Sequence, residues 1–230
     1  MKRLYLLCIS ILLIATSFQT AIAQSYPDYG VIYNSTSPAS RTLALGVNPQ
    51  GHLNAGIGIT ANGGTWKNPR TLVSGSGALG IAYNSSGSWY DATSPGCLCE
   101  GWGASAIDSW GVASVGSADV STGGVTNVTV KSFTVDTTSI VSTVWINDSK
   151  GQPMLEVTHR YGPSVEAPSS LFQAQVTITN ISGATLKDLR YKRVMDWDIP
   201  SPEFSELVDH VGVAASVGST RTPKVLSAGD

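Results

Sequence analysis

Carboxylates gather between residues 190 and 210, where the chain reads RYKRVMDWDIPSPEFSELVDH. Asp196 and Asp198 are two residues apart, so in an extended chain their side chains point to the same side. Together with Glu203 they are candidates for the pair of carboxylates with which an enzyme hydrolyses a glycosidic bond. Carboxylate oxygens are also the ligands that calcium prefers, so Asp196 and Asp198 are candidates for a calcium site as well.

A structural role competes with both interpretations. The two aspartates have Arg190, Lys192 and Arg193 close by as ion-pair partners across neighbouring strands, while Trp197 fills the core. The segment has no histidine or third acid at a spacing diagnostic of catalysis or metal binding. We therefore rank structural pairing first, calcium second and catalysis third, and calcium is the only cofactor that the sequence suggests.

Tryptophans form a second candidate site, for a carbohydrate. Trp66, Trp89, Trp102 and Trp110 all fall in the first half of the chain, which is rich in loops. Exposed aromatic rings stack on the apolar faces of sugars, and they line many ligand sites. Buried rings at sheet edges have the same sequence signature, and burial is the more common outcome.

The segment PGCLCEGWG contains Cys97 and Cys99, separated by one leucine. A metal site needs further ligands, and none of the three histidines is spaced near this pair. A redox centre typically has the spacing C-x-x-C, which this pair lacks. Residues two apart in a turning chain fall within the ~4.4–6.8 Å between Cα atoms that a disulfide tolerates, so we predict a disulfide, with two free thiols as the alternative.

The first 23 residues have the pattern of a signal peptide. Lys2 and Arg3 precede an apolar run, and the small residues Ala21 and Ala23 occupy the positions that a signal peptidase inspects. The run is shorter than the roughly 20 apolar residues that a membrane-spanning helix needs. Cleavage after Ala23 leaves residues 24–230 as an exported chain, and we expect it to have no membrane span.

The charge of this exported chain excludes one class of partner. Loss of Lys2 and Arg3 lowers the formal net charge from −2 to −4, and no basic patch remains to attract nucleic acid. Only 13% of the residues are charged, and glycine is abundant. This composition is typical of an extracellular β-rich protein, for which an extracellular polysaccharide or another surface component is the expected partner.

Short strands must position these residues. LFQAQVTITN, residues 171–180, alternates apolar and polar side chains, and residues 186–199 are predicted to return beside it as a hairpin. Further strands are predicted at 30–33, 42–47, 56–60, 80–83, 126–135, 139–146 and 154–161. The predicted fold is all-β, an antiparallel sandwich of jelly-roll or immunoglobulin-like type, with a possible boundary within it near residues 116–124.

The run VTITNISGATLKDLRYKRVMDWDIP, with PGCLCEGWG and the signal peptide, resembles exosortase-sorted bacterial surface proteins, the PEP-CTERM class. The resemblance covers about the second half of the chain and the cysteine loop. It implies a β-sandwich-like ectodomain followed by a Pro-Glu-Pro motif, a membrane helix and a basic tail, and it carries over no catalytic residues. None of these sorting features follows Val211, so we expect the chain to continue beyond Asp230.

These patterns together favour a secreted or cell-surface protein with a structural, adhesive or ligand-binding role and no catalysis. The alternative is a carbohydrate-active enzyme or carbohydrate-binding module that uses Asp196, Asp198 and exposed tryptophans.

The cysteine pair gives a direct test. We expect the folded protein that begins at Gln24 to show no thiol that a chromogenic disulfide reagent can titrate until it is reduced. Reduction should lower the melting temperature only slightly, because so short a ring removes little chain entropy. Two reactive thiols before reduction would contradict the disulfide.

Overall fold

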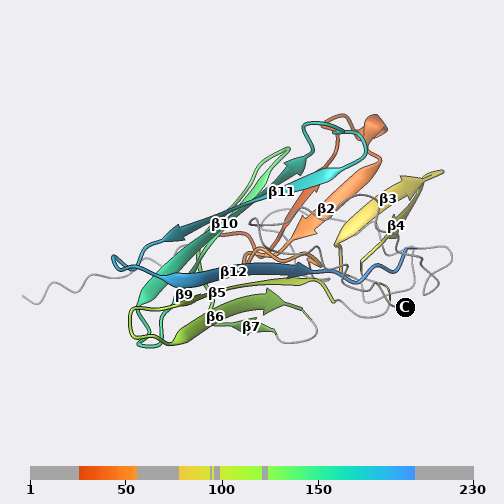
Figure 1. Ribbon diagram of the computed structural model, residues 1–230. Coiled ribbons are helices and arrows are strands. Elements are labelled where there is room, and N and C mark those ends of the chain that lie inside the picture. The colour runs from red at the N-terminus through yellow and green to blue at the C-terminus, as the bar shows by residue number, and fades with distance from the viewer. Residues whose placement is uncertain (1–25, 56–77, 94, 96–98, 121–123, 200–230) are drawn as a thin grey trace, which may run out of the picture.

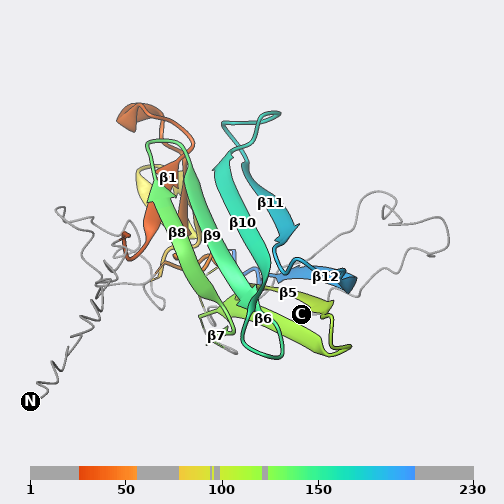
Figure 2. The same ribbon diagram turned by 90° about the vertical axis from the view of Figure 1, so that its left-hand side faces the viewer.

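The computed structural model describes residues 26–55, 78–93, 95, 99–120 and 124–199, which form an all-β structure (Figures 1 and 2). Its strands are β1 (Gly30–Tyr33), β2 (Leu43–Val47), β3 (Ile81–Ser85), β4 (Ser88–Asp91), β5 (Gly101–Ile107), β6 (Ala113–Asp119), β7 (Val125–Thr126), β8 (Thr129–Val135), β9 (Ile140–Asn147), β10 (Pro153–Pro163), β11 (Phe172–Asn180) and β12 (Lys187–Val194). They make three antiparallel sheets of four strands, in the orders β1-β2-β3-β4, β11-β10-β9-β8 and β12-β5-β6-β7. The predicted all-β, sandwich-like class is confirmed.

Helical structure within these ranges is limited to one 3-10 turn, η1 (Pro38–Ser40). No helix in the described part of the chain has the length and hydropathy to cross a membrane.

The sheet β11-β10-β9-β8 forms one layer, and the other two sheets pack against a single face of it (Figure 2). At one end Ile32 and Leu45 from the first sheet share an apolar cluster with Ile140 from β9. At the other end Trp102 and Ala104 from β5 share a cluster with β9 and β10 side chains. The second layer of the sandwich is therefore divided into two sheets.

Alternation along β9 and β10 explains this face. In β9 every second residue is buried, through Ile140, Ser142, Val144 and Ile146. In β10 the same phase places His159 between two apolar buried residues. Ser142 and His159 thus put polar groups in the middle of an otherwise apolar face, between the two apolar clusters.

The β8–β9 hairpin, predicted from the sequence, is confirmed in its pairing from Thr129↔Trp145 to Val135↔Ile140. Its turn is held by the Asp136 carboxylate, which accepts hydrogen bonds from the backbone N–H groups of Thr138 and Ser139, both 2.8 Å. Such a bond from a turn aspartate replaces the backbone partners that the turn lacks.

The predicted hairpin between residues 171–180 and 186–199 is wrong. β12 pairs with β5, whereas in the described structure β11 pairs only with β10 (Figure 1). The chain between β11 and β12 crosses from one layer to the other. This crossing gives the inward side chains of β12, Tyr191 and Arg193, buried aromatic and acidic partners in and beside β5.

Residues 48–53 form a turn after β2 that we call the junction turn. The Asn48 N–H donates to the His52 carbonyl, and the Gly51 N–H donates to the Asn48 carbonyl, both at 2.8 Å. Gly51 has a φ of +81°, and a Cβ added there would lie 2.6 Å from Nδ1 of His159. Glycine is therefore favoured here for two reasons, the positive φ and the close approach of His159.

Gly151 provides a matched control for this contact, because its φ is +79° and nothing lies within 4 Å of an added Cβ. We expect Gly151→Ala to lower the free energy of unfolding by about 1 kcal/mol, since only the backbone is strained. Gly51→Ala should lower it by a further 1–3 kcal/mol, roughly, because the methyl group overpacks the core. Urea unfolding of both variants measures the difference, and equal losses would show that His159 moves aside freely.

Candidate functional site

The structure places the predicted carboxylates in different surroundings. Asp196 and Asp198 both follow the end of β12; Asp196 is exposed, whereas Asp198 is 7% exposed. Arg190 pairs with Asp188 at 2.7 Å and so has a partner outside the predicted pair. Within the described ranges no group of three or more His, Cys, Asp or Glu side chains could hold a metal ion. Glu203 lies outside those ranges.

The candidate tryptophans do not form one surface where they are described. Trp89 is half-buried and packs edge-on against Tyr33, whereas Trp102 is 3% exposed and belongs to the core. Trp110 is 64% exposed in the turn after β5. Trp66 lies outside the described residues. Trp197, predicted in the core, is 40% exposed, which corrects that placement.

The predicted disulfide is only half described. Cys99 lies just before β5, and its carbonyl accepts a hydrogen bond from the Asp196 N–H at 3.2 Å. Cys97 lies outside the described residues, so the Cys97–Cys99 disulfide stays a prediction.

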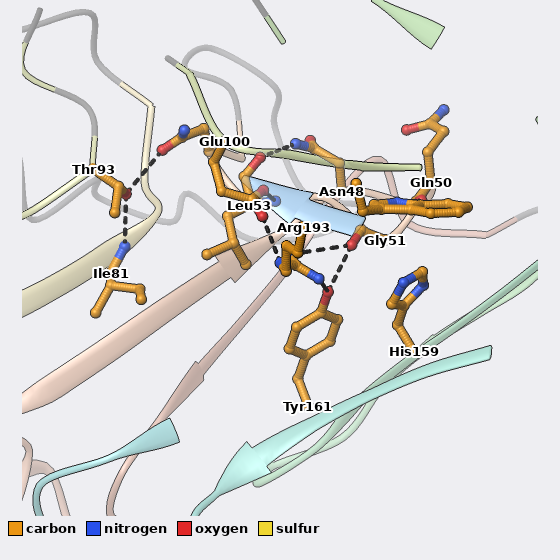
Figure 3. A network of polar contacts seen from close by, with 12 residues as sticks. Asn48, Gln50, Gly51, Leu53, Ile81, Thr93, Glu100, His159, Tyr161 and Arg193 are labelled. Atoms are coloured by element: carbon orange, nitrogen blue, oxygen red, sulfur yellow. Dashed lines mark hydrogen bonds and ion pairs between the residues drawn. The ribbon is translucent and has the colours of Figure 1, made fainter. Parts of the chain in front are cut away.

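A buried group of charged and polar side chains was missed by the sequence analysis, and we call it the junction cluster (Figure 3). At its centre, Nε of Arg193 lies 2.6 Å from a Glu100 carboxylate oxygen. The Arg193 guanidinium also donates to the Tyr161 hydroxyl at 2.6 Å. The second Glu100 oxygen accepts a hydrogen bond from the Leu53 N–H. The other members are His52, Trp102, Ser142, His159 and Tyr191.

The junction cluster fastens the junction turn to both layers. Three consecutive carbonyl groups, of residues 49–51, accept hydrogen bonds from the side chains of Ser142 at 2.6 Å, Trp102 at 2.8 Å and Tyr161 at 2.6 Å. These side chains come from β9, β5 and β10. The turn satisfies its backbone acceptors inside the protein, as a buried turn must.

Burial controls the protonation of this cluster. It lowers the pKa of His52 to about 4 and that of His159 to about 3, and the nearby Arg193 charge acts in the same direction. Burial raises the pKa of Glu100 above its ordinary value, although the Arg193 charge opposes this shift. Glu100 and His159 have no exposed surface. Perturbed groups indicate catalysis when they border a cleft. The perturbed groups Glu100, His52 and His159 are buried and do not line the trough, so we assign the cluster a structural role.

One signal in the sequence could have revealed part of the cluster. His159 falls in the same alternation phase as Leu155, Val157 and Tyr161, which predicts an inward side chain. Arg193 has the phase of Tyr191 on β12 in the same way. Nothing local indicates that Arg193 meets Glu100, because they are far apart in the chain.

The solvent-facing side of the sheet β12-β5-β6-β7 has a different composition, and it contains a hollow that we call the trough. Gly101, Gly103 and Ser105 face outward along the inner strand β5, alternating with the buried Trp102 and Ala104. Because two of these three positions have no side chain, the middle of the face is low.

Taller side chains on the neighbouring strands form the walls. Lys192 of β12 and Ser117 of β6 lie opposite Gly103 on its two sides. Val194 and Asp119 flank Gly101 in the same way. The trough has a volume of about 600 Å³ and is lined by Cys99, Gly101, Trp102, Gly103, Ala104, Ser105, Val115, Ser117, Asp119, Arg190, Tyr191, Lys192 and Val194. This volume is in the range of ligand sites.

The two sites lie mainly on opposite faces of the same strands, and Trp102 and Tyr191 of the junction cluster also line the trough. In β12 Arg193 points into the junction cluster, while Lys192 and Val194 border the trough. Comparison with family models, with curated proteins and with solved structures gives no match. The function is therefore inferred from the geometry of the trough and from the burial of Glu100, His52 and His159 in the junction cluster.

The two buried histidines predict how stability depends on pH. The ordinary pKa of histidine is 6.5, so below that pH the unfolded chain binds protons that the folded chain excludes until about pH 4 at His52 and about pH 3 at His159. The free energy of unfolding should fall as the pH falls from about 6.5 towards 4, by up to about 1.4 kcal/mol per pH unit for each histidine. Glu100 opposes this trend, because its raised pKa favours proton uptake by the folded state.

Urea unfolding at several pH values measures this slope, and His159→Gln should reduce it. The imidazole proton resonances of His52 and His159 should also stay at their neutral positions down to about pH 5. A stability that is flat from pH 7 to about 4.5, or resonances that titrate near 6.5, would show that water reaches the cluster.

Proposed function

We propose that the protein is a secreted, non-enzymatic binding protein whose trough takes an extended polysaccharide chain. The observation that carries this proposal is the trough itself, a low glycine floor on β5 between walls from β12 and β6. Gly103 leaves room above the sheet for a ligand chain, whereas at Gly101 an added Cβ would lie only 2.6 Å from Cβ of Asp119.

The residues that line the trough favour binding over hydrolysis. Glycosidases use two carboxyl groups about 5–10 Å apart. Among the described residues the trough lining includes one carboxylate, Asp119. That side chain already accepts a hydrogen bond from the Gly124 N–H at 3.2 Å. Asp198 is buried, as are the one acid of the junction cluster, Glu100, and its two histidines. The described lining of the trough therefore supplies one carboxyl group where a glycosidase needs two.

The chemistry of the walls fits a sugar chain. Val115 and Val194, 52% and 50% exposed, provide apolar surface against which the C–H faces of sugar rings can pack. Lys192 and Ser117 provide hydrogen-bonding groups for hydroxyls at the central row of the trough. From Gly101 to Ser105 the floor runs roughly 13 Å, so it suits an extended ligand.

Export of the chain is part of the same proposal. The signal-peptide pattern of residues 1–23 and the resemblance to exosortase-sorted surface proteins support a location outside the cell, where polysaccharide is the abundant ligand. Export with cleavage of the signal peptide is tested by N-terminal sequencing of the exported protein, which should begin at Gln24.

Gly103 offers a matched pair of variants to test the trough. An added Cβ there would lie 3.5 Å from the Gly116 carbonyl oxygen and 3.6 Å from Cβ of Ser117, which are ordinary contacts. Gly103→Ala should therefore bind nearly as well as the wild type. Gly103→Leu extends a side chain into the centre of the floor and should weaken binding at least tenfold with little change in melting temperature.

Affinity electrophoresis in gels that contain neutral or acidic polysaccharides measures this binding. A wild-type protein that no polysaccharide retards, or a Gly103→Leu variant that is retarded as strongly as Gly103→Ala, would contradict the proposal. Release of reducing ends during the assay would favour the enzyme instead.

A further inference from the structure

The edge strands of the three sheets differ in how they are protected against pairing with another strand. β1 and β4 have four residues each and β7 has two. β8 contains Lys131 and a register shift, and β12 is mostly charged and also has a register shift. Short length, charge and bulges are the usual features that keep an edge from pairing with another chain.

β11 has none of these features. Its nine residues, FQAQVTITN, contain no charge, no proline and no glycine. Its pairing with β10 runs without a shift from Phe172↔Pro163 to Asn180↔Leu155. Figure 2 shows β11 as the outermost strand of its sheet. The edge is therefore long, regular and uncharged.

The backbone groups that this edge presents can be identified from two hydrogen bonds at its ends. The Ser164 N–H donates to the Leu171 carbonyl at 2.8 Å, and the Ile181 N–H donates to the Met154 carbonyl at 3.0 Å. The backbone groups of residues 171 and 181 therefore face β10. Because the register is regular, the N–H and C=O groups of every odd-numbered residue between them also bond to β10. The even-numbered residues, Phe172, Ala174, Val176, Ile178 and Asn180, direct their N–H and C=O groups outward.

We propose that β11 pairs antiparallel with β11 of a second copy of this chain, around a twofold axis at Val176. The two sheets of four strands then join into one continuous sheet. Each outward-facing residue finds a partner, which makes about ten backbone hydrogen bonds, a number typical of a specific interface. This inference does not depend on the trough, which lies on another sheet.

Self-pairing suits this strand because equal charges meet when a strand pairs with its own copy, and β11 has none. In the register centred on Val176, Gln175 lies opposite Thr177 on one face, and Ala174 lies opposite Ile178 on the other. Polar side chains thus meet polar ones, and apolar side chains meet apolar ones. The same operation on β12 would bring its basic residues together.

Ala174 gives a variant that blocks the edge alone. Its N–H points outward, so Ala174→Pro removes a donor for the second copy and no hydrogen bond to β10. Sedimentation velocity should show a dimer for the wild type and for the control Ala174→Ser at micromolar concentration. Ala174→Pro should be monomeric with at least a tenfold weaker association, and β-sheet circular dichroism should confirm that it is folded.

Cysteine substitution tests the register. A mixture of Gln175→Cys chains and Thr177→Cys chains should form interchain disulfides, because these residues face each other across the proposed pair, whereas each variant alone should form few. A wild type that stays monomeric, a dimer that Ala174→Pro does not weaken, or equal cross-linking in the single variants would each overturn the proposal. An assembly that grows beyond the dimer would overturn it too, because a twofold pair closes on itself.

Discussion

Glu100 and Arg193 form a buried ion pair, with Nε of Arg193 2.6 Å from a carboxylate oxygen of Glu100, where the two sheets of the divided layer meet. The Glu100 carboxylate is fully buried, and an unpaired buried charge costs several kcal/mol, so it requires a cation and hydrogen-bond donors within reach. Arg193 and the Leu53 N–H meet this requirement. The two partners lie in β12 and directly before β5, so the pair holds the edge strand of one sheet beside the junction turn of another.

This requirement explains how one sandwich accommodates a divided layer. Two sheets that meet side by side over a third leave backbone groups unpaired where they meet, and the apolar clusters at either end supply no hydrogen bonds. The junction turn and the side chains around it fill this gap with polar contacts, of which Tyr161 makes two, one to the Gly51 carbonyl and one from Arg193. The histidines are neutral there because burial and the Arg193 charge both oppose protonation.

The same strands carry the proposed binding face because strand residues alternate between the two sides of a sheet. Anchoring the inward residues of β5 and β12 fixes the height and spacing of the outward ones that border the trough. The open edge of β11 lies in the opposite layer. Ligand binding and self-association are therefore assigned to separate sheets, and one can occur without blocking the other.

Alternation of apolar and polar residues is a local property, so the all-β class and most strands can be predicted from the sequence, including the β8–β9 hairpin and the strand LFQAQVTITN. The sequence also suggested Asp196 and Asp198 as a pair of carboxylates. Although they are close in the chain, Asp196 is exposed and Asp198 is buried. The pairing of β12 with β5, the contact between Glu100 and Arg193, and the floor formed by Gly101 and Gly103 could be seen only in the folded chain. These contacts join residues far apart in the chain, and the choice among competing strand partners depends on which buried groups each pairing satisfies.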